Sequence, residues 1–247
     1  MILINELYDL LIAQTRADKR GLSVSIDEFN LFIKVVNERI YSNYYRKFEE
    51  SNEVSASLGK FKEFMEAVAL VAGVGSLPTD FKALIGKPRY LSGSSYVSVD
   101  LVSTLELIER QEDYLTQPTL THPVCQLGGQ DANDRLQIMV YPNTIATVYV
   151  DYLRTPEEPF LDYYVNDTTF DPTYMLNAES VNIPSGYTYR DGTEGSGVAV
   201  ASQTVNLEWD EEDLPMILAL LSQMVGLSLP SQELIEVGNA EEIKNSN

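Results

Sequence analysis

The spacing of the apolar residues changes near Thr116, and this change constrains the fold of the 247-residue chain more than any other sequence feature. Before this position, apolar residues recur every three or four positions, as they do on the buried face of an amphipathic helix. After it, apolar and polar residues alternate, as they do along a strand with one buried face. The pattern predicts an α+β protein that combines an N-terminal helical bundle with a small antiparallel β-sheet.

Two helices are predicted in the first 50 residues. The first covers residues 2 to 15, where apolar side chains have three-four spacing. The second starts at a capping box, in which Ser25 and Glu28 can each satisfy a free backbone donor of the other, and it reaches about residue 50. The aromatic stripe on this helix is interpreted as core packing rather than as a cofactor site.

Two further helices are predicted before Thr116. One would stop at a turn that contains Gly73. Its buried face would consist of Leu58, Phe61, Met65, Val68 and Val71. The other would span about Val99 to Tyr114, and its apolar side would consist of Leu101, Leu105 and Ile108. Residues 1–115 are therefore expected to form a helical bundle.

Residues 116–160 are expected to form the small antiparallel sheet. One strand is predicted around Ile138 and a second around Val150, since apolar residues alternate with polar ones in both segments. The sequence Tyr141-Pro142-Asn143-Thr144 between them suits a tight reversal. The two segments are therefore predicted to be neighbouring strands.

The last third divides into an arm and a helical end. Residues 161–208 are polar and rich in tyrosine, and they are expected to be extended or β-rich, with short strands at 181–189 and 198–207 and a hairpin tip at 191–197. Residues 209–247 are expected to be helical, because acids precede an apolar run and Pro215 falls in the first turn. Ser231 can cap a final amphipathic helix.

The charge balance is strongly acidic. The chain has 17 basic and 37 acidic residues, a net charge of −20, and residues 155–247 alone hold 2 basic and 17 acidic residues. Binding to DNA or RNA by phosphate neutralisation is disfavoured, because an acidic surface repels the nucleic-acid backbone. The sequence does not exclude an acidic wall past which nucleic acid slides. The acidic N-terminus is wrong for a signal peptide, and no apolar run is long enough to predict a membrane span.

The residues that could carry chemistry are few. Cys125 is the only cysteine and is expected to be a small buried strand residue, and His122 is the only histidine and is expected in a turn. Glu157 and Glu158 could be an acid and base pair, a metal cradle or a solvated corner, and their position between two prolines favours the corner. No catalytic, metal-binding or cofactor site is predicted, and the chain is expected not to be an enzyme.

The 15 tyrosines outnumber the single tryptophan, and many lie in polar surroundings. Tyrosine combines apolar contact area with a polar tip, so such residues suit surfaces that are wet before assembly and buried afterwards. The same tyrosines could equally be strand formers in a β-rich arm. The sequence leaves these two interpretations open.

One set of strand and turn motifs has a family resemblance. The motifs are Pro123-Val124, Tyr141-Pro142, Tyr152-Leu153-Arg154-Thr155-Pro156, and the pair Pro159 and Phe160. Over about residues 77–229 the chain resembles virion structural proteins of tailed phages that infect Bacteroidetes, and it is most similar to the neck or ring (head-to-tail adaptor) proteins of crAss-like phages. Phe160 stands where a tryptophan is expected in that pattern.

The resemblance implies a non-enzymatic homo-oligomeric ring of about twelve copies, without cofactors and without membrane contact. It also implies that the ring contacts the portal and other neck or tail rings, and lets genomic DNA pass without tight binding. Such a protein would be made in the host cytoplasm and would reside in the neck of the virion. The expected subunit interface consists of Tyr152, Arg154, Pro156, Pro159, Phe160, Tyr163, Tyr164 and Trp209. We further hypothesise that the acidic half lines the DNA channel.

Two other classes of function stay open from the sequence. One is an extracellular or virion-surface binding module, such as an adhesin or carbohydrate-binding protein, that uses the tyrosine-rich loops. The other is a hydrolase that uses a pair of carboxylates.

Overall fold

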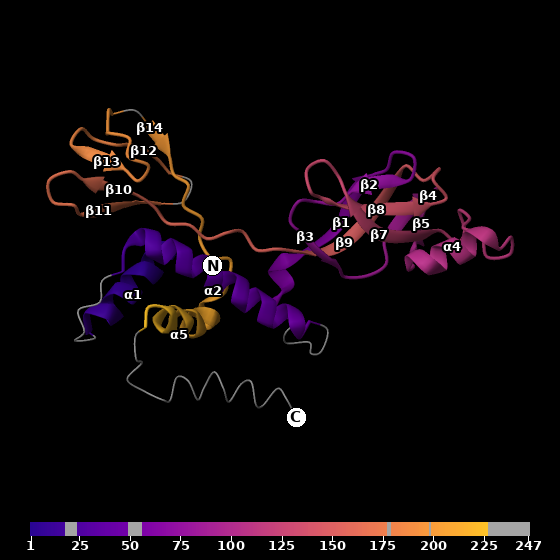
Figure 1. The fold of residues 1–247 in the computed structure, drawn as a ribbon, viewed down its shortest axis with the longest axis horizontal. Coiled ribbons are helices and arrows are strands. Elements are labelled where there is room, and N and C mark those ends of the chain that lie inside the picture. Colours follow the sequence, from indigo (N-terminus) through magenta and orange to yellow (C-terminus); the bar gives the residue numbers. More distant parts are fainter. Residues whose placement is uncertain (18–23, 49–55, 177–178, 198, 227–247) are drawn as a thin grey trace, which may run out of the picture. The chain divides into compact units, whose positions relative to one another are not determined.

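The protein is mixed α+β, with four helices and several small sheets in the residues that the structure describes (Figure 1). The structure is a computed structural model, and it describes residues 1–17, 24–48, 56–176, 179–197 and 199–226. The chain forms two compact units. Unit 1 consists of Met1–Lys47 and Pro156–Asn247, and unit 2 consists of Phe48–Thr155. Unit 2 is therefore inserted into the sequence of unit 1, and the chain is not divided into the four consecutive segments that the sequence suggests.

The described part of unit 1 contains three helices and two small sheets. Its helices are α1 (Ile4–Ala17), α2 (Ile26–Arg46) and α5 (Leu214–Met224), and its strands are β10 (Asp162–Asn166), β11 (Pro172–Met175), β12 (Ser180–Asn182), β13 (Tyr187–Tyr189) and β14 (Ala199–Ala201). The strand order is β11-β10-β13 in one sheet, and β12 pairs with β14 in the other. The α+β class that the sequence predicts is confirmed.

The helices of unit 1 begin and pack largely as the sequence predicts. The capping box of α2 is present, because Glu28 N donates to Ser25 Oγ at 3.2 Å while Ser25 N donates to Glu28 Oε2 at 2.9 Å. The core face of α2 includes buried Phe29 and Ile33. Helix α5 packs against α1 and α2, and the hydroxyl of its buried Ser222 lies 2.9 Å from Gln14 Oε1. The predicted helix after Ser231 lies outside the described residues.

Residues 161–208, which are expected to be extended or β-rich, form the five short strands β10 to β14 in their described part. Buried Met175, Ile183 and Tyr189 form a small hydrophobic cluster that ties the two sheets together. The predicted hairpin tip is a tight turn, in which Gly192 N donates to Tyr189 O at 2.8 Å. It is not the tip of a β13–β14 hairpin, however, since β13 pairs with β10 and β14 pairs with β12.

Unit 2 contains most of the strands of the protein. Its strands are β1 (Lys62–Ala69), β2 (Val74–Ser76), β3 (Phe81–Leu84), β4 (Arg89–Ser92), β5 (Ser95–Ser98), β6 (Asp100–Leu101), β7 (Val124–Gln130), β8 (Leu136–Tyr141) and β9 (Thr147–Arg154), and its helix is α4 (Thr104–Glu112). One sheet has the order β1-β9-β4-β5, with β3 also on β9, and the other has the order β2-β8-β7-β6. All these pairings are antiparallel except that of β6 with β7.

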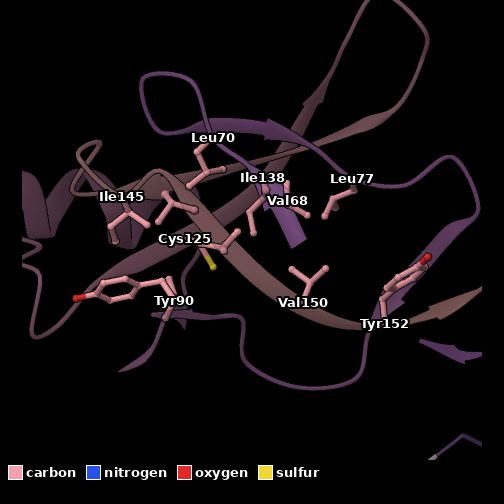
Figure 2. Packing of buried hydrophobic residues seen from close by; sticks show 12 residues of the cluster. Val68, Leu70, Leu77, Tyr90, Cys125, Ile138, Ile145, Val150 and Tyr152 are labelled. Atoms are coloured by element: carbon pink, nitrogen blue, oxygen red, sulfur yellow. The ribbon is translucent and has the colours of Figure 1, made fainter. Parts of the chain in front are cut away.

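The two sheets of unit 2 share one hydrophobic core. Figure 2 shows side chains from both sheets gathered between the strands, among them Val68 and Val150 from one sheet and Cys125 and Ile138 from the other. All four of these side chains are buried. The alternation that predicts strands around Ile138 and Val150 is confirmed, because it is the alternation between this core and the opposite faces of the sheets.

The predicted bundle over residues 1–115 is not confirmed beyond α2, although the helix predicted near Val99 to Tyr114 is present as α4. Residues 62–69, which the three-four spacing assigns to a helix, form strand β1, preceded by a single 3₁₀ turn at Gly59–Phe61. A β-bulge between Glu63 and Glu66, at which Met65 has φ of 59°, interrupts the alternation of side chains along β1. The less exposed positions of β1, half-buried Lys62 and Met65 and buried Val68, are therefore three apart instead of two, which imitates a helical period.

The predicted single sheet is also wrong in its pairing. Strands β8 and β9 are not partners: β8 pairs with β2 and β7, whereas β9 pairs with β1, β3 and β4. The Tyr141-Pro142 turn, whose peptide bond is cis, carries the chain from one sheet to the other. Gly73 makes the matching transfer from β1 to β2 in a tight turn with φ of 82°. The turn at Gly73 is therefore confirmed, although no helix ends there.

Candidate assembly site

The eight predicted interface residues are divided between the two compact units. Tyr152 and Arg154 belong to unit 2, whereas the remaining six belong to unit 1, because the boundary lies between Thr155 and Pro156. The structure thus places the Tyr-x-Arg-x-Pro motif at the point where the chain passes from one unit to the other. Each part is described within its own unit.

Tyr152, one of the predicted interface residues, is a core residue of unit 2. Its side chain is buried, its ring stacks on Phe81 with 5.6 Å between centroids, and its hydroxyl donates to Asp80 Oδ1 at 3.1 Å. Burial, followed by the negative charge of Asp80, raises the pKa of Tyr152 well above its usual range. The prediction that Tyr152 closes the core face of a strand is confirmed.

Arg154 is held against its own unit by apolar and charged neighbours. Its guanidinium lies 5.3 Å from the centroid of the Phe61 ring, and Nε lies 3.5 Å from Glu63 Oε1. Only 17% of the side chain is exposed, so the stacking and the ion pair are partly shielded from water. Arg154 therefore anchors the end of β9, and it offers little surface to a neighbouring subunit.

The proline corner is fixed to helix α2. Glu157 and Glu158 are exposed, which confirms the interpretation of a solvated corner. The backbone of Glu157 accepts from Asn37 Nδ2 at 3.1 Å and donates to Glu208 Oε2 at 2.9 Å. Glu158 forms an exposed ion pair with Lys34 at 2.8 Å, and exposed pairs of this kind contribute little to stability. Pro159 is buried and Pro156 is half-buried.

Trp209, another of the predicted interface residues, is buried inside unit 1. The indole is buried, its Nε1 donates to Asn37 Oδ1 at 2.7 Å, and its rings stack on Tyr44 at a centroid distance of 5.5 Å. Tyr44 in turn donates to Asp213 Oδ1 at 2.8 Å, just before α5 begins. The lone tryptophan therefore joins α2 to the start of the C-terminal helix.

A buried carboxylate beside the corner has no counterpart in the sequence prediction. Asp162 is fully buried and accepts four hydrogen bonds, from Tyr163 N, Tyr189 Oη, Arg190 Nε and Gln203 N, at 2.8 to 3.0 Å. The guanidinium of Arg190 also lies 4.6 Å from the centroid of the Phe160 ring. The only sequence signal is an acid directly after an apolar residue, and no local pattern identifies its partners.

Tyr163 and Tyr164 keep part of their surface exposed, and they lie on β10 with Phe160 just before them. Tyr163 Oη donates to Asp27 Oδ1 at 3.0 Å, and burial, with this bond, raises its pKa to about 12. Tyr164 packs edge-on against Tyr187 at a centroid distance of 5.5 Å. Phe160, Tyr163 and Tyr164 thus each contact a different neighbour within unit 1: Arg190, Asp27 and Tyr187.

The residues that could carry chemistry are placed as the sequence predicts. Cys125 is buried in β7, and burial raises the pKa of its thiol to about 12, so it is not a reactive nucleophile. His122 is exposed in a turn. Among the described residues, no three histidine, cysteine or acidic side chains lie close enough together to hold a metal ion. The described helices are also each too short or too polar to cross a bilayer.

Comparison with known proteins gives no relative: no family model matches the chain, and no curated protein matches its sequence.

Proposed function

We propose that the protein is a non-enzymatic structural subunit of a phage head-to-tail connector, in which copies form a ring between portal and tail. The observation that carries this proposal is the exposure of large apolar side chains on both units. Phe170 in unit 1 is 77% exposed, and Phe64 and Val71 in unit 2 are 63% and 80% exposed. Exposed apolar groups of this size suit contact with other proteins.

The ion pairs formed by the acidic residues support a structural role. The more buried carboxylates are committed to their own unit: Asp151 pairs with Arg89, Asp131 pairs with Arg135, and Asp162 pairs with Arg190. A hydrolase needs carboxylates that are free to act on a substrate. In this chain such groups instead fix strands and turns.

The proposed interface within unit 1 is formed by the partly exposed residues of the predicted set, Pro156, Phe160, Tyr163 and Tyr164. The neighbouring hairpin of β10 and β11 presents Phe170, whose φ of 59° is unusual for an aromatic residue. Backbone strain at an exposed aromatic side chain is consistent with a contact residue. Tyr152 and Trp209 are not part of this proposal, because both are buried.

The charge distribution supports the proposed position in the virion neck. Residues 155–247 hold 17 acidic and 2 basic residues, and we propose that this part faces the DNA passage. Like charges would keep the genome from adhering as it passes. If a solved ring places this part wholly on the outer face, the channel assignment is wrong.

The test is the mass of the full chain in solution, measured by sedimentation velocity and native mass spectrometry, alone and with the portal protein of the same phage. We expect a closed ring, formed either alone or on addition of the portal. The variant Pro156→Ala should fold normally and hinder assembly, whereas Pro184→Ala, at an exposed proline of the same unit, should not.

A persistent monomer that does not bind the portal would contradict the proposal. Glycan binding without a ring would favour the alternative of a surface binding module. Turnover of generic glycoside or peptide substrates would favour the hydrolase.

A further inference from the structure

Helix α4 of unit 2 is amphipathic with its apolar stripe facing outward. Its buried contact is Leu107, which packs with Val102, Val124 and Tyr141. The residues of the predicted apolar side, Leu101, Leu105 and Ile108, are instead 51%, 67% and 48% exposed. The periodicity therefore predicts the helix correctly, but it selects the face that the unit leaves uncovered.

Further large apolar side chains are exposed in the segment that follows the helix. Tyr114 and Leu115 are 90% and 89% exposed, and Leu120 is 52% exposed. We call these six residues the α4 surface: Leu101, Leu105, Ile108, Tyr114, Leu115 and Leu120. Six large apolar side chains within twenty residues exceed the scattered exposure that needs no explanation.

The backbone that carries the α4 surface is held by its own hydrogen bonds. Asp113 accepts from Leu115 N and from Thr116 Oγ1, both at 3.0 Å. Thr119 and His122 exchange two backbone bonds at 3.2 and 3.3 Å, and the hydroxyl of Tyr90 donates to the carbonyl of Leu120. A fixed backbone that presents apolar side chains outward loses less entropy on binding than a flexible segment would.

The charges around the α4 surface are acidic. The nearby cations are already paired, since Lys87 binds Asp100 at 2.7 Å and Arg110 binds Glu106 at 2.7 Å. Within the described residues, Glu109 and Glu112 have no ion-pair partner, and the carboxylate of Asp113 accepts only from uncharged groups. Besides Arg110, His122 is the only side chain of residues 100–122 that can carry a positive charge. The rim of the surface thus keeps an uncompensated negative charge.

This charge favours a cationic occupant. Residues 227–247 hold four glutamates and one lysine and would be repelled, whereas lysine or arginine beside an apolar face would be attracted. We infer that the α4 surface binds a different protein, through an amphipathic helix whose apolar face is flanked by lysine or arginine. This docking surface lies outside the predicted subunit interface, and it does not rest on the proposed ring.

The inference is tested with two labelled helical peptides, one with leucine and lysine faces and one with leucine and glutamate faces. Fluorescence anisotropy with the full chain should show binding of the lysine peptide, and at least about tenfold weaker binding of the glutamate peptide. Leu105→Glu should weaken binding of the lysine peptide by about tenfold or more. Leu31→Glu, at an equally exposed leucine on α2, should leave it unchanged within about twofold.

A second measurement covers the case in which Leu105→Glu does not fold. Leu105→Cys can be labelled selectively with an environment-sensitive dye, because the native thiol of Cys125 is buried. Its emission should shift to shorter wavelength when the lysine peptide binds, and a label at Leu31→Cys should not shift.

Four results would overturn the inference. These are no binding of the lysine peptide, equal binding of both peptides, equal effects at Leu105 and Leu31, and a dimer of the chain that Leu105→Glu dissociates. The last result would identify a second copy as the occupant. None of them depends on whether the chain forms a ring with a portal protein, so the two proposals fail independently.

Discussion

The indole Nε1 of Trp209 donates a 2.7 Å hydrogen bond to Oδ1 of Asn37, which lies 172 positions earlier in the chain, and both side chains are buried. The same asparagine donates from Nδ2 to the carbonyl of Glu157 at 3.1 Å. One side chain of α2 therefore fixes both the proline corner and the start of the C-terminal segment.

Replacing Asn37 with alanine should destabilise unit 1 by about 2 kcal/mol, because a buried indole donor and a backbone carbonyl both lose their partner. The measurement is urea denaturation followed by the fluorescence of Trp209, the only tryptophan. The control Asn43→Ala, on the same helix, should change stability by less than about 0.5 kcal/mol. Equal effects of the two substitutions would show that the Asn37 bonds contribute nothing.

Replacing Asp162 with asparagine should cost about 3 kcal/mol or more, because it leaves the Arg190 guanidinium without its counter-ion and offers one acceptor oxygen instead of two. The same fluorescence titration reports the loss. Asp191→Asn is the matched control, since Asp191 is exposed and accepts a local bond from Thr193 N at 2.8 Å. A loss no larger than that of the control would mean that the buried network is not a determinant of stability.

Substitutions at two glycines of unit 2 can distinguish the cost of backbone strain from the cost of a steric clash. Both have positive φ, 82° at Gly73 and 63° at Gly93. A Cβ at Gly73 would lie 2.7 Å from the carbonyl oxygen of Val140, whereas nothing lies within 4 Å of a Cβ at Gly93. Gly93→Ala should cost about 1 kcal/mol, and Gly73→Ala at least about 2 kcal/mol more. Denaturant-dependent reaction of the buried Cys125 thiol measures both, and similar losses would contradict the packing argument.

The loop between β7 and β8 should make unit 2 sensitive to acid through Asp131. Partial burial by itself raises the pKa of Asp131, but hydrogen bonds from the backbone and side chain of Arg135, from Ser76 and from Asn133 lower it well below its usual range. A carboxylate with a lowered folded-state pKa stabilises the fold above its unfolded pKa, and this contribution is lost as the pH falls through the folded value.

The stability difference between the wild type and Asp131→Asn should therefore be largest near neutral pH and should narrow from about pH 5 downward. Urea denaturation followed by circular dichroism at each pH gives the difference. Asp134→Asn, in the same loop, should keep the pH dependence of the wild type. If the difference in unfolding free energy between Asp131→Asn and the wild type does not change with pH, the hydrogen bonds to Asp131 do not stabilise its charged form, and the prediction is wrong.

Local sequence rules predict α1, the capping box of α2, strands β8 and β9, and α5, because each depends on short-range spacing or capping. They fail at β1, where a bulge at Met65 places apolar residues at a helix-like interval. They also fail for the exposed face of α4, since spacing alone cannot tell which side of a helix the fold will cover.

The contacts of the candidate site are harder to predict from the sequence than the helices and strands are. Tyr152 and Trp209 are large amphipathic side chains of the type that occurs both in cores and at interfaces. Only their long-range partners, Asp80 and Asn37, decide in favour of the core, and no local pattern encodes such pairs. The Asp162 network is hidden for the same reason, because its bonds to Arg190 and Gln203 span 28 and 41 positions.

The insertion of unit 2 into unit 1 also sets an order of events during synthesis. All of the chain that forms unit 2 has been made once Thr155 is added, so this unit can complete its sheets while the ribosome is still translating. Helices α1 and α2 are made before unit 2, whereas their partners Trp209 and α5 are made after it. The packing of α5 and Trp209 on these two helices therefore cannot form until more than 160 further residues have been added.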